Sequence, residues 1–96
     1  MEKQKRKHVT EMYEAILKIQ NLEECEQFFE DLCTPTEMAA MEQRFAVASL
    51  LKQDKVYMEI LEATSASTAT ISRVKRMLNY GNGVLGEVMD RLNEDK

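Results

Sequence analysis

The stretch SASTATISRVKRMLNY, residues 65–80, decides the fold of this 96-residue chain. It opens with small hydroxyl residues that can cap a helix, and its apolar side chains recur at helical spacing at Ile71, Val74 and Leu78. A glycine follows the stretch, and glycine commonly ends helices. The pattern predicts a helix over about residues 68–79, with one buried face and one polar face.

A second, shorter apolar pattern precedes this helix. Residues 56–63 carry Tyr57 and Ile60 at a spacing that turns both side chains inward, and a polar four-residue turn follows. In that turn Ser65 stands where a glycine is often used to reach a positive φ, so we expect modest backbone strain there. Two short helices joined in this way match a helix-turn-helix, which we expect at about residues 56–80.

The polar face of the second helix supplies the candidate DNA contacts. Small side chains near its first turn can approach base edges, whereas longer basic side chains further along reach the phosphate backbone and fix the register. The candidates are Ser67, Thr68, Ala69, Thr70, Ser72, Arg73, Lys75 and Arg76. An ordinary capped helix with a solvated basic face has the same spacing, so spacing alone leaves both interpretations open.

The rest of the chain predicts four more helices and no strand. Capping patterns mark two helix starts, at Asn21 with Glu24 and at Thr34-Pro35-Thr36-Glu37. No stretch alternates polar and apolar residues long enough for a strand. The expected additional helices cover about residues 9–19, 22–33, 35–52 and 84–92. The chain is therefore expected to be all-α, with six helices.

Charge is unevenly distributed along the chain. The net charge is −4, yet residues 10–62 hold twelve acids and four bases, whereas residues 64–86 hold three bases and no acid. Exposed charges are screened beyond about 8 to 10 Å, so a locally basic face can meet phosphate. Residues 1–8 form a basic N-terminal arm that we expect to be flexible. Its bases are Lys3, Lys5, Arg6 and Lys7. The arm either reaches DNA or serves as a solubilising tail.

The sequence lacks the residue patterns that several classes of function require. No nucleophile, base and orienting residue can be grouped around His8, the one histidine, so we expect no enzyme. Cys25 and Cys33 lie about 12 Å apart along one expected helix, too far for a disulfide, and no metal-ligand spacing accompanies them. We therefore expect no metal and no cofactor. The chain has neither an apolar run of roughly 18 residues nor a secretory signal, which predicts a cytoplasmic protein without a membrane partner.

Four motifs, taken in order, resemble the tryptophan repressor family. They are Leu32-Cys33-Thr34-Pro35-Thr36-Glu37, Gln43-Arg44, Leu50-Leu51-Lys52 and Ala69-Thr70-Ile71-Ser72-Arg73. The ending Asn79-Tyr80-Gly81-Asn82-Gly83 resembles the YerC/YecD-type subgroup of that superfamily. The resemblance implies a six-helix single domain, residues 9–93, that forms an intertwined homodimer. It also implies a transcriptional regulator, usually a repressor, that binds double-stranded DNA at a pseudo-palindromic operator and is nucleoid-associated when bound.

The resemblance also bears on a small-molecule corepressor. In the family the corepressor lies between two arginines, which match Arg44 and Arg73 here. A glycine and a serine that admit and hold the ligand are replaced by Val74 and Met77, so we expect a vestigial pocket filled by protein and regulation without tryptophan. Arg44 would then pair with a carboxylate, and Arg73 would contact phosphate. The alternatives are a repressor that depends on tryptophan or another amino acid, and a protein-interaction dimer that does not bind DNA.

Overall fold

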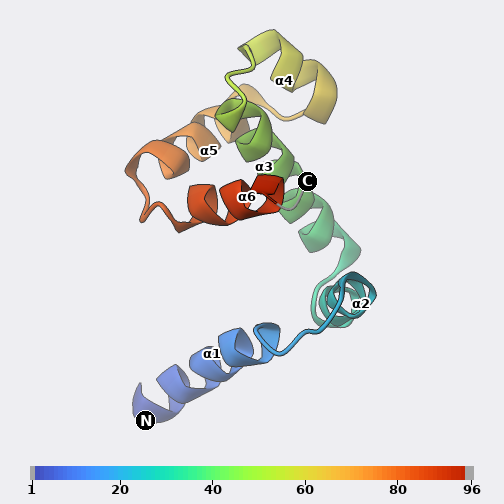
Figure 1. The fold of residues 1–96 in the computed structure, drawn as a ribbon, viewed down its shortest axis with the longest axis vertical. Helices are drawn as coiled ribbons and strands as arrows, with labels where there is room; N and C mark the ends of the chain where they lie inside the picture. Colours follow the sequence, from blue (N-terminus) through green and yellow to red (C-terminus); the bar gives the residue numbers. More distant parts are fainter. Residues whose placement is uncertain (1, 95–96) are drawn as a thin grey trace. The chain divides into compact units, whose positions relative to one another are not determined.

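The structure, a computed structural model, describes the backbone of residues 2–94 and the side chains of residues 8–94. Within this range the chain forms six helices and no strand (Figure 1), which confirms the all-α class. The helices are α1 (Glu2–Ile16), α2 (Leu22–Leu32), α3 (Pro35–Lys52), α4 (Tyr57–Thr64), α5 (Thr68–Tyr80) and α6 (Val84–Glu94). The chain divides into two compact units, Met1–Met38 and Ala39–Lys96. None of the helices in the described range is long and apolar enough to cross a bilayer.

The first helix, α1, differs from its expected bounds at both ends. It begins at Glu2 rather than Val9, because residues 2–7 are good helix formers but include no apolar residue whose spacing could reveal a helix. It ends at Ile16, after which i→i+3 turns continue the backbone to Ile19. The basic side chains of the arm lie outside the described side chains, so their expected contacts stay predictions. They are Lys3, Lys5, Arg6 and Lys7.

Side-chain caps fix the starts of α2 and α3. The carboxamide oxygen of Asn21 accepts a hydrogen bond from the N–H of Glu24 at 2.8 Å. Before α3, the hydroxyl of Thr34 accepts from the N–H of Glu37 at 3.1 Å, and the Glu37 carboxylate accepts from the N–H of Thr34 at 2.8 Å. The capping box expected at Thr34 is thus confirmed, and α3 begins at Pro35 as expected.

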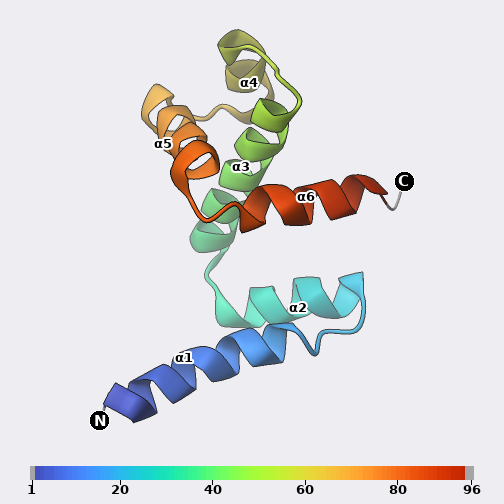
Figure 2. The same cartoon turned by 60° about the vertical axis from the view of Figure 1, so that its left-hand side comes forward.

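Helices α3 to α6 build the core of the second unit (Figure 2). The buried residues are Val47 and Ala48 of α3, Ile60 of α4, Ala66 of the following turn, Ile71 and Val74 of α5, and Met89 of α6. The partly buried residues packed against them are Leu50, Leu51, Leu78 and Leu85. Lys52 of α3 and Asp90 of α6 form an ion pair at 3.0 Å. The burial expected for Ile71 and Val74 is confirmed, so α5 packs one face on the core and keeps the other free.

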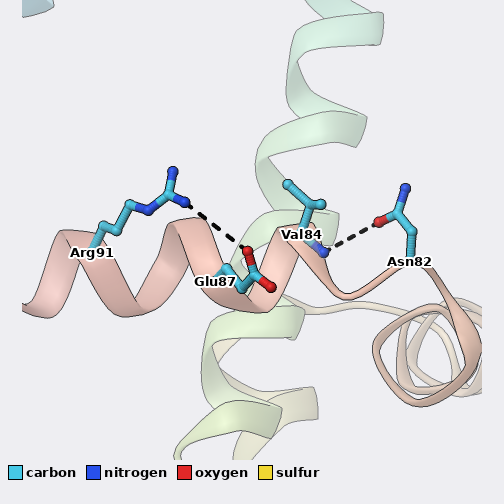
Figure 3. Close-up of polar contacts among 4 residues, drawn as sticks. All are labelled: Asn82, Val84, Glu87 and Arg91. Carbon is cyan, nitrogen blue, oxygen red and sulfur yellow. Dashed lines mark hydrogen bonds and ion pairs between the residues drawn. The ribbon is translucent and has the colours of Figure 1, made fainter.

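The start of α6 is fixed by the loop that precedes it (Figure 3). The carboxamide oxygen of Asn82 accepts a hydrogen bond from the N–H of Val84 at 3.2 Å. Further along α6, a guanidinium nitrogen of Arg91 lies 4.0 Å from a carboxylate oxygen of Glu87. Both side chains of this pair are largely exposed, so the pair adds little stability.

Large apolar side chains remain exposed on several helices. In the first unit, no described side chain is buried. Leu17, in the turn after α1, is 84% exposed, and Leu22, the first residue of α2, is 74% exposed. In the second unit, Phe45 of α3 and Val88 of α6 are 42% and 45% exposed. Single exposed apolar residues are ordinary, but faces of this extent along several helices are typical of surfaces that bind another chain.

Candidate nucleic-acid interface

Helices α4 and α5 form a helix-turn-helix within one residue of the expected bounds. The three residues 65–67 join Tyr57–Thr64 to Thr68–Tyr80. Before α4, the N–H of Val56 donates to the carboxylate of Glu59 at 3.3 Å. The valine side chain has no oxygen, so only this half of a capping box forms.

The turn between the two helices depends on a left-handed residue. Ser65 has φ 58° and ψ 20°, and its N–H donates to the carbonyl oxygen of Leu61 at 2.8 Å, so the positive φ expected there is confirmed. Ala66 follows and is buried. Its N–H donates to the hydroxyl of Thr64 at 3.2 Å, and that hydroxyl donates to the carbonyl oxygen of Ile60 at 2.7 Å. The Thr64 hydroxyl therefore satisfies two backbone groups where the chain leaves α4.

Gln43 connects α3 to this helix-turn-helix. Its Nε2 donates to the carbonyl oxygen of Thr64 at 3.0 Å, in partly buried surroundings. The last carbonyl groups of a helix have no partner within the helix, so Gln43 supplies one that α4 lacks. Gln43 belongs to one of the four motifs, but the sequence does not predict this contact, because no local pattern relates two residues that are 21 positions apart.

Ser67 caps helix α5. Its hydroxyl oxygen accepts from the N–H of Thr70 at 3.1 Å and donates its proton to the Thr70 hydroxyl, also at 3.1 Å. The carbonyl oxygen of Ser67 accepts from the N–H of Ile71 at 3.0 Å. The Ser67 side chain is therefore engaged within α5, although it is exposed at the surface.

Most of the predicted DNA contacts share the exposed face of α5. The exposed residues are Ser67, Thr68, Ala69, Ser72, Arg73, Lys75 and Arg76, and Thr70 is half-buried. Within the described residues, none of the three basic side chains forms an ion pair. No acid occurs between residues 64 and 86 to neutralise them locally. This face can therefore offer both hydroxyl groups and unpaired positive charge to an anionic surface.

Tyr57 lies beside the candidate site, although its spacing in the sequence predicts an inward position in the core. The side chain is 40% exposed, so the expected inward position was wrong. Tyr57 is the first residue of α4. A tyrosine with an apolar ring and a polar tip suits such a boundary between core and solvent. Its hydroxyl oxygen lies 2.6 Å from Oγ1 of Thr68, the first residue of α5.

The four residues that match a ligand pocket lie in different surroundings. Val74 is 1% exposed and belongs to the core, whereas Met77 is 44% exposed. Arg44 is exposed, and its Nε donates to the carbonyl oxygen of Ala40 at 3.3 Å rather than to a carboxylate. An open hollow of about 590 Å³ is lined by Ala69, Ser72, Arg73, Arg76 and Met77. Val74 thus fills space in the core, whereas Arg73 and Met77 border a surface depression.

The chain is similar to known proteins over almost its full length. A family model described as Trp repressor protein matches residues 7–93. The uncharacterized protein YerC of Bacillus subtilis (strain 168) is 45% identical over 94 residues, which cover 98% of this chain and 90% of that protein. A TrpR-like protein from Eubacterium eligens ATCC 27750 has a crystal structure with a TM-score of 0.88 and 46% identity, covering 97% of this chain and 96% of that one. A structure from Staphylococcus aureus, provisionally assigned as a Trp repressor, has a TM-score of 0.86 and 48% identity, covering 90% of this chain and 86% of that one.

Proposed function

The chain belongs to the Trp repressor family, in its YerC-type branch, and from this premise we propose that it is a sequence-specific DNA-binding transcriptional regulator. The observation that carries the proposal is the exposed face of α5, which has no acid and combines hydroxyl groups with three bases that form no ion pair among the described side chains. Repression is the expected sign of regulation, and nucleoid DNA in the cytoplasm is the expected site of action. We propose no enzymatic activity for this chain.

DNA recognition by this face follows from the residues that it presents. Helix α5 enters the major groove, where Thr68, Ala69, Thr70 and Ser72 are small enough to let the backbone approach base edges. Arg73, Lys75 and Arg76 reach the phosphate groups on either side and fix the register. Helix α4 braces α5 through the turn that holds the buried Ala66, and Gln43 of α3 holds the end of α4 in place. The sequence-dependent part of the affinity therefore comes from the first two turns of α5.

An intertwined homodimer is the proposed binding form. The exposed apolar faces of both units support it, because a second copy would remove them from water. A two-fold axis would place the two copies of α5 in successive major grooves, about 34 Å apart. The operator is then a pseudo-palindrome whose half-sites are one helical turn apart.

Regulation without a corepressor is the favoured mechanism. Val74 is buried among the core residues, so its side chain packs α5 directly on them. This supports a recognition helix that the protein itself holds in place. A second candidate is a repressor that requires tryptophan or another amino acid. The open hollow beside Arg73 and Met77 favours it, because an arginine could pair there with a carboxylate ligand.

Selection of genomic DNA fragments by the purified protein, at fixed salt and with or without L-tryptophan, tests the proposal. Recovery of a palindromic site in both conditions is the expected result. Recovery only with tryptophan would favour the second candidate, and no enrichment in either condition would leave a protein-interaction dimer. A variant with Arg73, Lys75 and Arg76 all changed to Gln serves as the control, which should lose enrichment while keeping its helical circular dichroism.

A further inference from the structure

The hydrogen bond between Tyr57 and Thr68 joins the first residue of α4 to the first residue of α5. We propose that Tyr57 is a positioning residue for DNA reading, which orients the Thr68 hydroxyl so that Thr68 donates to an acceptor on a base edge. The inference rests on the proposed DNA-binding function and adds a specificity-determining pair to it. Tyr57 acts through Thr68 and need not touch DNA itself.

The direction of the hydrogen bond follows from the chemistry of the two hydroxyl groups. Their oxygens are 2.6 Å apart, a short distance for this kind of bond, and either could donate. A phenolic hydroxyl is the more acidic of the two and therefore the better donor, whereas the aliphatic hydroxyl of threonine is the better acceptor. Tyr57 thus donates to Thr68, and the proton of Thr68 remains available for a third group.

The hydroxyl of Thr68 differs from those of Ser67 and Ser72, because its orientation is held while its proton remains available. Ser67 already gives its proton to Thr70, so it has none for DNA in this arrangement. Ser72 is exposed and forms no hydrogen bond through its side chain in the described part of the chain, so its hydroxyl can rotate to donate or to accept. A hydroxyl that rotates freely tolerates either kind of base edge. The hydroxyl of Thr68, held by Tyr57, favours an acceptor such as N7 or O6 of guanine over the N4 donor of cytosine.

Tyr57 therefore controls the base preference at one position of each half-site. Replacement of Tyr57 by Phe keeps the ring and removes only the hydroxyl, which frees the Thr68 hydroxyl to rotate. We expect the ratio of the affinity for the preferred base pair to that for a substituted base pair at this position to fall about three- to tenfold. A change of this size corresponds to the usual contribution of one hydrogen bond. Affinity for unrelated DNA, and the salt dependence of binding, should stay unchanged because no charge is removed.

The test measures binding of wild type, Tyr57→Phe, Thr68→Val and the double variant to the selected operator and to all its single base-pair substitutions. Tyr57→Phe should flatten preference at one position per half-site, Thr68→Val should flatten the same position, and the double variant should match Thr68→Val. Tyr80→Phe is the matched control, because Tyr80 is 83% exposed and its hydroxyl forms no hydrogen bond in the described residues; it should leave the profile unchanged.

Two other results would overturn the inference. A merely structural role of Tyr57 would lower the melting temperature and weaken binding evenly at all positions, and an unchanged profile would mean that Thr68 reads DNA without Tyr57. In either case the proposed function stands, provided that the wild type selects an operator. A wild type that selects no DNA would instead refute the proposed function, and this inference with it.

Discussion

Nε2 of Gln43 lies 3.0 Å from the carbonyl oxygen of Thr64, and this hydrogen bond joins α3 to the last turn of α4. Removal of the donor by Gln43→Ala leaves a partly buried carbonyl without its partner. We expect the free energy of unfolding to fall by about 1 to 2 kcal/mol. Chemical denaturation measures the change. Gln53→Ala is the control, because among the described residues the Gln53 side chain bonds only to the Ser49 hydroxyl, in an exposed contact within one helix turn. This change should alter stability by less than about 0.5 kcal/mol. Equal losses in the two variants would contradict the role given to Gln43.

The two serines that flank Ala66 should respond to mutation with opposite signs. Ser65 lies in the left-handed region, so Ser65→Gly relieves strain that outweighs the entropy cost of glycine, and stability should rise by about 0.5 kcal/mol. Ser67 caps α5, so Ser67→Ala removes an acceptor from the Thr70 N–H and should cost about 1 kcal/mol. Thermal unfolding of both variants gives the comparison. Two changes of the same sign would disprove this account of the turn.

The ionisation of Glu37 should make α3 sensitive to acid. The hydrogen bond from the Thr34 backbone N–H, and then one with the Thr34 side chain, lower the pKa of Glu37 below its ordinary value of 4.5. A pKa depressed by folding stabilises the folded chain above the unfolded pKa, and this contribution is lost as pH falls through the folded pKa. Stability should therefore decline below about pH 4.5, and part of that decline should be missing in Glu37→Gln.

Carboxyl titration by NMR checks the cause of this shift. Thr34→Ala should raise the pKa of Glu37 only part of the way to 4.5, because the backbone N–H of residue 34 remains. Thr36→Ala is the matched control and should leave the pKa unchanged. A wild-type Glu37 that titrates at or above 4.5 would show that the capping box is open in solution.

The sequence could predict those features whose signals are local. The box at Thr34 and Glu37 lies within four residues and located the start of α3, and the apolar spacing of Ile71 and Val74 predicted the buried face of α5. Residues 2–7 escaped detection, because a helix without an apolar face has no periodicity to read.

Contacts between distant residues could not be predicted in this way. Gln43 bonds to a residue 21 positions away, and Tyr57 to one 11 positions away. Their partners depend on how α3, α4 and α5 pack, and no pattern along the chain contains that information. Gln43 holds the end of α4, and Tyr57 contacts the start of α5. Local patterns therefore identified the exposed face that we propose to contact DNA, but not the contacts that hold α4 and α5 in place.

The salt dependence of DNA binding should distinguish bases on α5 from bases elsewhere in the chain. Arg76 is exposed on α5 and unpaired in the described structure, so Arg76→Gln should make the slope of log affinity against log salt shallower by about 0.9. The affinity for operator and for unrelated DNA should fall together, because a phosphate contact carries no sequence information. Arg91→Gln removes the same charge from α6, where Arg91 faces Glu87, and it should leave the slope unchanged. Equal slopes for both variants would mean that net charge, and not the face of α5, governs binding. A shallower salt slope in Arg76→Gln alone would place phosphate beside α5. It would also mean that the net negative charge of the chain does not govern its contact with DNA.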